Sequence, residues 1–150
     1  MTRTSQRRAA TALAALLAAG LVGGASTAAG PRDFYSASGR ALTVPYELEL
    51  NEVQRDASRS VVEVAGFHER SAPGARWLIC RYAELAQQRG FSHWNALYPE
   101  PGRETLVIGF SNDASATPED LFGPGHARER VLAERMAPVD RYATLCGFRR

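Results

Sequence analysis

The sequence predicts an α+β domain, in which an antiparallel sheet of four to five strands carries one long central helix and a short second helix on one face. Two observations lead to this prediction. Residues 42–50 and 60–68 have the alternating or β-branched pattern of strands, and residues 73–89 have apolar side chains at helical spacing. Further strands follow, and the order β-β-α-β-β-α-β favours helices packed against an antiparallel sheet.

The N-terminal residues have the three-part pattern of a secretory signal peptide. Three arginines precede an apolar stretch over residues 9–22, and small residues follow that stretch. It is shorter than the roughly 20 strongly apolar residues that span a bilayer. We therefore expect residues 1–28 to be a cleaved signal peptide, residues 29–41 a flexible lead-in and residues 42–150 a single α+β domain.

Removal of the signal peptide changes the charge of the protein. The full chain has a formal charge of +2, and residues 1–28 contain three arginines and no acidic residue, so the exported chain has a formal charge of −1. The remaining arginines are spread among acidic residues, which argues against nucleic acid as a partner. No cysteine follows the apolar stretch directly, so we expect no membrane anchor after signal cleavage.

Two strands are predicted before the long helix. Along residues 42–50, every second residue is apolar, as in a half-buried strand. Pro45 has no amide proton for a ladder bond, so this strand is expected at a sheet edge or at a bulge. Residues 60–68 are rich in β-branched side chains and form the second strand, after the polar connection 51–59.

The long helix is predicted over residues 73–89. Ser71 or Ala72 is expected to be its N-cap, and Gly90 is expected to end it in a left-handed conformation. The apolar side chains recur every three or four residues and form one stripe. This stripe includes Leu78, Tyr82 and Leu85.

The second half of the chain is predicted to contain two strands, a short helix and a final strand. Residues 91–98 and 104–111 are expected to pair as a hairpin across the Pro- and Gly-rich turn 99–102. The short helix falls within residues 126–137, and Pro138 ends it. Residues 141–148 alternate and are predicted to form the final strand.

Residues 62–97 contain a glycine turn after a strand, a helical Arg-x-Ala-Glu-Leu signature and a glycine–aromatic pattern that leads into a strand. The residues that carry these features are Gly66, then Arg81-Tyr82-Ala83-Glu84-Leu85, then Gly90-Phe91-Ser92-His93-Trp94. In these features the chain resembles a family of uncharacterised bacterial envelope proteins, many of which are small lipoproteins. The resemblance implies an envelope location and this order of elements, and it implies no reaction. Those relatives often carry a lipidation cysteine after the signal, and its absence here favours periplasmic residence over tethering.

Four residues are predicted to bind a ligand or partner: Trp77, Arg81, Glu84 and Trp94. Two tryptophans at one exposed edge would supply the rigid aromatic area of a binding hot spot. The alternative for both tryptophans is packing in the core, because a small domain needs large apolar side chains. The alternative for Arg81 and Glu84, which lie three residues apart on the helix, is an ordinary ion pair.

A competing hypothesis is a metal or hydrolytic site that uses His68, Glu69 and His93. Imidazole and carboxylate groups bind zinc, but the chain has no His-Glu-x-x-His motif. It also has neither the Gly-x-Ser-x-Gly turn of serine hydrolases nor a phosphate-binding glycine loop. We expect no cofactor.

Cys80 and Cys146 are the two cysteines of the chain, and they are predicted to form a disulfide because an exported protein meets an oxidising compartment. Cys80 borders the apolar stripe of the long helix, and Cys146 lies in the predicted final strand. The bond would hold the C-terminal segment on the central helix. The alternative is two free, buried thiols.

These patterns together favour a periplasmic or secreted protein that binds an envelope protein or a small molecule and catalyses nothing. The alternative is a small periplasmic hydrolase or metal-dependent enzyme that uses His68, Glu69 and His93. An inhibitor of a secreted enzyme is a third hypothesis, which the sequence does not separate from the first.

Overall fold

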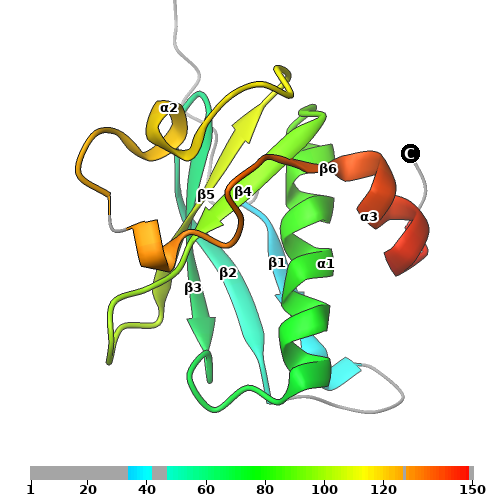
Figure 1. Ribbon diagram of the computed structural model, residues 1–150. Coiled ribbons are helices and arrows are strands. Elements are labelled where there is room, and N and C mark those ends of the chain that lie inside the picture. The colour runs from blue at the N-terminus through cyan, green and yellow to red at the C-terminus, as the bar shows by residue number, and fades with distance from the viewer. Residues whose placement is uncertain (1–33, 42–46, 127, 149–150) are drawn as a thin grey trace, which may run out of the picture.

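The computed structural model describes residues 34–41, 47–126 and 128–148. In this part of the chain, six strands form one antiparallel sheet in the order β1-β2-β3-β5-β4-β6 (Figure 1). Two hairpins, β2–β3 and β4–β5, are joined at the centre of the sheet by the pairing of β3 with β5. The strands are β1 (Ser36–Ser38), β2 (Glu49–Arg55), β3 (Arg59–Ala65), β4 (His93–Leu97), β5 (Thr105–Ser111) and β6 (Ala137–Pro138).

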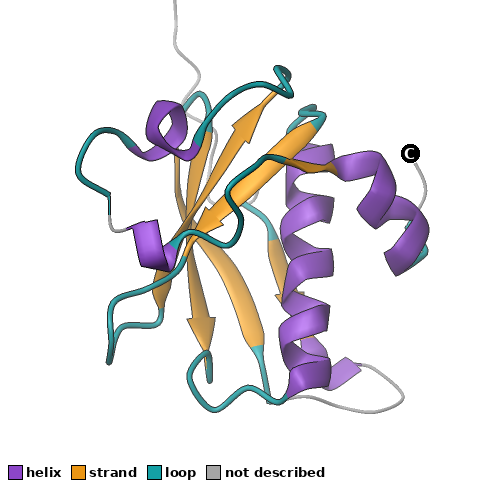
Figure 2. Cartoon of the chain, in the orientation of Figure 1, coloured by secondary structure: helices purple, strands orange, loops and turns teal. Residues whose placement is uncertain are grey.

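Three α-helices lie on the two faces of this sheet. They are α1 (Ala72–Gln88), α2 (Pro118–Phe122) and α3 (Val139–Cys146), and short 3-10 turns occur at Gly39–Ala41 and Arg128–Arg130. The long helix α1 covers one face and contacts α3, whereas α2 lies on the other face (Figure 2). The α+β class and the antiparallel sheet are therefore as predicted, with one or two strands more than expected.

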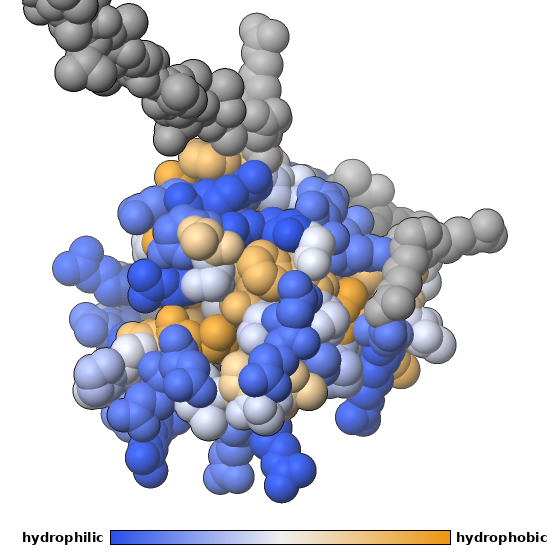
Figure 3. All heavy atoms as spheres, turned by 90° about the horizontal axis from the view of Figure 1, so that it is seen from above, coloured by the Kyte–Doolittle hydropathy of each residue, from blue (hydrophilic) through white to orange (hydrophobic). Residues whose placement is uncertain are grey.

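The main core lies between α1 and the sheet. Alternate residues of the central strands point to α1, as the period of two requires. The fully or almost fully buried side chains of this layer include Leu50, Val62, Val64, Leu78, Tyr82, Leu85, Leu106, Ile108 and Phe110. Seen from above, the surface of the molecule has hydrophobic residues near the centre of the view and hydrophilic residues around them (Figure 3).

Both ends of α1 have the caps that the sequence predicts. The Ser71 hydroxyl accepts a hydrogen bond from the Gly74 amide at 3.2 Å, which satisfies one of the amides that a first turn leaves without a partner. At the other end, Gly90 has a φ of +79°, a conformation that suits glycine. The helix begins one residue before the predicted range and ends one residue before its predicted end.

The second helix differs from the prediction in its position and in its face. The described residues of the segment 126–136 contain the 3-10 turn Arg128–Arg130 and the bridge residue Val131 but no α-helix, and the helix forms earlier, at α2. Gly109 explains the face, because a Cβ atom there would lie 2.9 Å from the Leu121 Cβ. Ile108 and Phe110 face α1, so the position between them, Gly109, lies on the opposite face of the sheet. Because Gly109 has no side chain there, α2 can approach this face closely.

The C-terminal segment is a helix and not the predicted strand over residues 141–148. In α3 the buried residues are Val139 and Ala143, which are four positions apart and share one face of a helix. Gly147, with a φ of +73°, ends this helix. Cys146 therefore lies in α3, and not in a strand.

The N-terminal part of the described chain also differs from the expectation. Residues 34–41, which we expected to be part of a flexible lead-in, contain edge strand β1, and Tyr35 is in the core. The predicted strand 42–50 is described only from residue 47, and β2 begins at Glu49, so Pro45 lies outside the described residues. The predicted signal peptide 1–28 lies outside them as well. None of the helices within the described ranges is long and apolar enough to cross a membrane.

Candidate functional site

A pocket of about 440 Å³ lies between the start of α2 and residues 126–134. It is on the side of the sheet opposite α1, so it is separate from the main core. Its lining contains both charges and aliphatic groups. The lining residues are Thr117, Pro118, Glu119, His126, Arg128, Val131, Ala133 and Glu134.

One wall of the pocket is the first turn of α2, and a capping box fixes it. The Thr117 hydroxyl accepts from the Asp120 amide at 3.3 Å, and the Asp120 carboxylate accepts from the Thr117 amide at 2.8 Å. The tight contact of Leu121 with Gly109 holds the same helix on β5. This wall is therefore anchored both locally and to the sheet.

The opposite wall is held against the edge of β4. Asn95, which is 1% exposed, donates from Nδ2 to the Ala133 carbonyl at 2.8 Å. Backbone bonds join the Leu132 amide to the Ala96 carbonyl and the Tyr98 amide to the Arg130 carbonyl, both at 2.8 Å. Residues 130–133 thus continue the sheet beside β4, and they hold this wall at a defined distance from β5 and α2.

His126 enters the lining with one ring nitrogen engaged. Its Nδ1 lies 2.8 Å from the Gly123 carbonyl oxygen, and its ring meets the edge of Phe122 at a centroid distance of 6.0 Å. A carbonyl oxygen only accepts, so Nδ1 carries the proton in this contact. In the neutral imidazole, Nε2 is then a hydrogen-bond acceptor.

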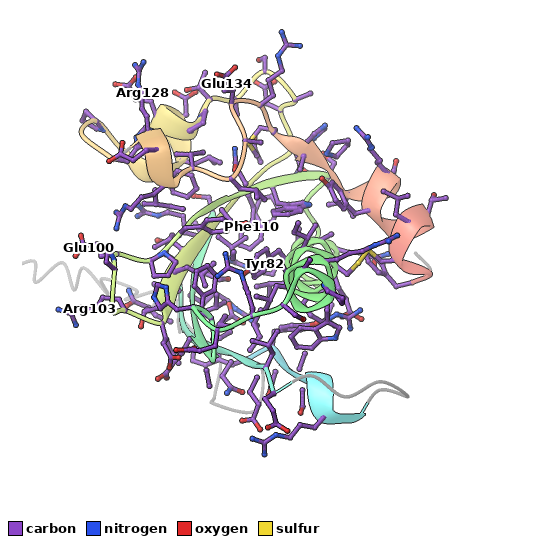
Figure 4. All side chains as sticks on the ribbon, turned by 60° about the horizontal axis from the view of Figure 1, so that its bottom comes forward. Tyr82, Glu100, Arg103, Phe110, Arg128 and Glu134 are labelled. Atoms are coloured by element: carbon purple, nitrogen blue, oxygen red, sulfur yellow. A yellow bond between two sulfur atoms is a disulfide. The ribbon has the colours of Figure 1, made fainter. Side chains whose placement is uncertain are left out.

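Three charged side chains of the lining stand without partners. Glu119, Arg128 and Glu134 are exposed, and within the described residues none of them has an ion pair or a side-chain hydrogen bond. Figure 4 shows Arg128 and Glu134 on the same side of the molecule, away from Tyr82 of α1. The pocket therefore combines two carboxylates, one guanidinium and one imidazole with aliphatic side chains.

Three of the four residues predicted to bind a ligand do come together, but they surround the buried side chain of Tyr35. The Tyr35 hydroxyl donates to Glu84 Oε2 at 2.5 Å, and Arg81 Nη1 donates to the same oxygen at 2.6 Å. The Arg81 guanidinium lies 6.0 Å from the ring centre of Trp77, which is 9% exposed. Burial, and then the hydrogen bond to Glu84, raise the pKa of Tyr35, so its hydroxyl stays a donor. This cluster joins β1 to α1.

The fourth of these residues, Trp94, lies in the core. It is fully buried, and its ring meets Tyr82 at 5.8 Å and Tyr142 at 5.3 Å, both edge to face. Trp77 and Trp94 therefore do not flank an exposed edge, and the alternative of core packing describes both. Trp94 links α1 to α3 through aromatic contacts.

His68, Glu69 and His93 are not brought together. Strands β3 and β4 both pair antiparallel with β5, so they run in the same direction. His68 follows the end of β3 and His93 begins β4, which places them at opposite ends of the sheet. His68 Nε2 lies 2.7 Å from the Arg103 carbonyl oxygen, and His93 Nδ1 lies 2.9 Å from the Ser92 hydroxyl. In the described part of the chain, no three His, Cys, Asp or Glu side chains gather as a metal site would require.

Comparison with known proteins adds no relative to this description. No protein-family model, no curated protein and no solved structure matches the chain. The resemblance to envelope proteins therefore stays a prediction that rests on residues 62–97.

The residues that line the pocket are not among those that the sequence predicts to bind a ligand. The available signals were the Thr117-Pro-Glu-Asp cap and the glycines on either side of Pro124, which mark a short helix followed by a turn. Neither signal indicates that Ala133 and Glu134 lie across from that cap. Their position depends on the bonds that Asn95 makes.

Proposed function

We propose that this protein is an exported, non-enzymatic binding protein that holds a small polar molecule in the pocket between α2 and residues 126–134. The observation that carries the proposal is the gathering of three charges, Glu119, Arg128 and Glu134, around one pocket with anchored walls, where none of the three has an ion-pair partner among the described residues. Ligand pockets typically combine a mostly apolar lining with a few polar groups that orient the ligand.

Several charges elsewhere in the described fold are paired with one another. Glu52 pairs with Arg55, Glu84 with Arg81 and Glu100 with Arg130. Several other carboxylates bind arginines or backbone amides. A ligand that enters the pocket between α2 and residues 126–134 does not have to break such internal pairs before it meets Glu119, Arg128 and Glu134.

Export is supported by two independent features. The N-terminal pattern is that of a signal peptide, and Cys80 is bonded to Cys146 with a Cα–Cα distance of 5.7 Å. The likeness of residues 62–97 to envelope proteins agrees with both. Because no lipidation cysteine follows the apolar stretch, we propose the periplasm or the exterior of the cell as the working location.

Binding is favoured over catalysis by the state of the one hydroxyl in the pocket lining. Thr117 Oγ1 donates to Asp120 Oδ2 at 2.7 Å, so this hydroxyl is committed to the cap of α2. A nucleophile would need to be activated by a neighbouring base. The separation of His68 from His93 removes the main reason for the enzyme hypothesis.

The proposal is tested by titrating the ¹⁵N-labelled purified protein with a library of small polar fragments. We expect some of these compounds to shift the amide signals of Thr117, Arg128 and Glu134. The variant Ala133→Trp, which fills the pocket, should lose these shifts. Ala114→Trp is the matched control, because Ala114 is exposed and is not part of the lining.

Two results would contradict the proposal. One is a library in which no compound shifts the pocket amides. The other is a partner protein that cross-linking in the envelope captures equally well with the Ala133→Trp variant and with the unchanged protein. The binding surface would then lie outside the pocket.

A further inference from the structure

We propose that the ligand of this pocket is a zwitterion with an aliphatic body, of the size of a free amino acid. Its ammonium group would lie between Glu119 and Glu134, and its carboxylate would lie on Arg128. This inference rests on the binding function proposed above and names the chemical class of the ligand.

The acceptors of the pocket match an ammonium group. Such a group has three N–H donors and no acceptor. The lining offers the carboxylates of Glu119 and Glu134 and, because Nδ1 of His126 carries its proton towards Gly123, the acceptor Nε2 of the neutral imidazole. Donors on the ligand therefore meet acceptors of three side chains, and two of these carry a negative charge.

Arg128 would bind the carboxylate at the other end of the ligand. A guanidinium binds a carboxylate through two parallel hydrogen bonds, a geometry that a lysine side chain would not offer. The lining thus contains two carboxylates and one guanidinium, so it offers both signs of charge. A purely anionic ligand would lie beside two glutamates of like charge, and a purely cationic one would leave the guanidinium of Arg128 without a counter-charge.

The remaining lining is aliphatic and would contact the apolar part of the ligand. Pro118, Val131 and Ala133 offer apolar surface beside the charges. Val131 is fixed by its bridge to Leu97 at the edge of β4. The volume of about 440 Å³ falls within the range of small-molecule sites, roughly 300–1,000 Å³, and is ample for one amino acid.

The test compares three matched probes by NMR titration at pH 7: L-leucine, its methyl ester and 4-methylpentanoate. The ester lacks the carboxylate charge, and 4-methylpentanoate lacks the ammonium group. We expect L-leucine to bind about 5- to 10-fold more tightly than either, the factor that one ion pair of about 1 kcal/mol or slightly more provides.

Variants assign each end of the ligand. Arg128→Gln should weaken the binding of L-leucine but not that of the methyl ester, and Glu134→Gln should weaken the binding of L-leucine but not that of 4-methylpentanoate. Glu129→Gln is the matched control, because Glu129 is an exposed neighbour outside the lining. L-Glutamine is titrated in parallel, so that the zwitterion is tested with a second side chain.

The outcomes separate this inference from the proposed function. Equal affinity for all three leucine-derived probes, or binding of other fragments in the absence of amino-acid binding, would overturn the zwitterion and leave the binding function in place. If neither amino acids nor any library fragment shift the pocket amides, both proposals fall.

Discussion

At the scale of single residues, Glu52 has the most demanding environment in the fold. Its side chain is fully buried, and it accepts hydrogen bonds from the Tyr35 amide at 3.0 Å, from Ser60 Oγ at 2.5 Å and from Arg55 Nε at 2.9 Å. Ser60 Oγ in turn accepts from Arg89 at the end of α1. The carboxylate therefore joins β1, β2, β3 and α1, and its desolvation is offset by these bonds.

We predict that Glu52→Gln lowers the free energy of unfolding by about 3 kcal/mol at pH 7. The amide keeps the shape of the side chain but loses the charge opposite Arg55, and its NH₂ group faces donors. Glu63→Gln is the control, because Glu63 is exposed on the neighbouring strand β3. Urea denaturation followed by circular dichroism measures both.

The effect of Glu52 also depends on pH. Burial raises the pKa of its carboxyl, but hydrogen bonds from Arg55, Ser60 and Tyr35 and the charge of Arg55 together lower that pKa below its usual value. In the unfolded chain, the pKa of a glutamate side chain is about 4.3. The stabilisation by the Glu52 carboxylate is therefore complete above that pH and is lost as the pH falls through the lower folded-state pKa. The difference in stability between the unchanged protein and Glu52→Gln should therefore shrink between pH 5 and pH 3. A constant difference would show that this charge is not the cause.

Gly109 is the residue that gives α2 its place, and Gly109→Ala tests this. In a strand, alanine in place of glycine is normally favourable. Here the added Cβ would lie 2.9 Å from Leu121 Cβ and 3.1 Å from Phe122 Cε1, so α2 has to move. We expect a loss of about 1–3 kcal/mol in the free energy of unfolding and shifted amide signals throughout α2. Thr105→Ala, at an exposed position of β5, should do neither.

At the scale of elements, α1 is stabilised by the stripe that it packs on the sheet. Leu78 and Leu85 are 1% and 0% exposed. We predict that Leu78→Ala or Leu85→Ala lowers the free energy of unfolding by about 2–5 kcal/mol, as large-to-small changes in cores do. Gln88→Ala, on the exposed side of the same helix, should change it little. Chemical denaturation that finds equal losses at both positions would contradict the phase of the helix.

The elements that the sequence predicts well are those whose signals are local. Helix α1 has a cap, a stripe and a terminal glycine within one segment, and β3 and the β4–β5 hairpin have β-branched or alternating runs next to a Pro- and Gly-rich turn. Each of these features lies within one continuous segment of the chain, so it can be recognised without knowledge of the fold.

The elements that were predicted wrongly depend on distant partners. Residues 141–148 alternate like a strand, but the contact of α3 with α1 and the bond to Cys80 favour a helix. Strand β1 exists because β2 offers an edge and because Tyr35 reaches Glu52 and Glu84, which lie 17 and 49 positions further along the chain. The alternation of apolar and polar residues in a short segment does not show which distant residues the segment contacts.

The candidate site follows the same rule. Residue type alone favours Trp77, Arg81, Glu84 and Trp94 as a site, and the structure places them in packing or ion-pair contacts. The pocket between α2 and residues 126–134 forms instead where Asn95 and Gly109, both on the face opposite α1, hold two connecting segments. A buried asparagine in an apolar strand is the one sequence feature that could have indicated a segment crossing this face.

At the scale of the whole molecule, the export that we propose requires removal of the N-terminal segment. We predict that the protein recovered from the periplasm or the medium begins near Ala29, because Ser26 and Ala28 give small residues at the positions that a signal peptidase requires. Intact-mass measurement of the fractionated protein decides this. Recovery of the uncleaved chain in the membrane fraction would show that residues 1–28 are an anchor.

The disulfide connects the central helix α1 to the C-terminal helix α3. Cys80 lies in the middle of α1 and Cys146 at the end of α3, 66 positions apart, and the pairing is the one that the sequence predicts. Around it, Tyr142 of α3 packs on Trp94 and half-buried Phe148 packs on the core. The C-terminal helix is only eight residues long, too short to be stable by itself. Its order therefore depends on the bond and on these aromatic contacts.

We predict that the double variant Cys80→Ser/Cys146→Ser loses up to about 4 kcal/mol of unfolding free energy, the entropy that closing a loop of this length removes from the unfolded chain. Amide exchange in α3 should become fast before that in β3 and β5, because the short helix loses its covalent attachment while the sheet keeps its own pairing. Reductant should have the same effect on the unchanged protein and none on the double variant, which is the control. Alkylation of the unfolded, unreduced protein should modify no thiol. Two modified thiols, or an α3 that stays protected without the bond, would mean that aromatic packing alone holds the C-terminal helix on α1.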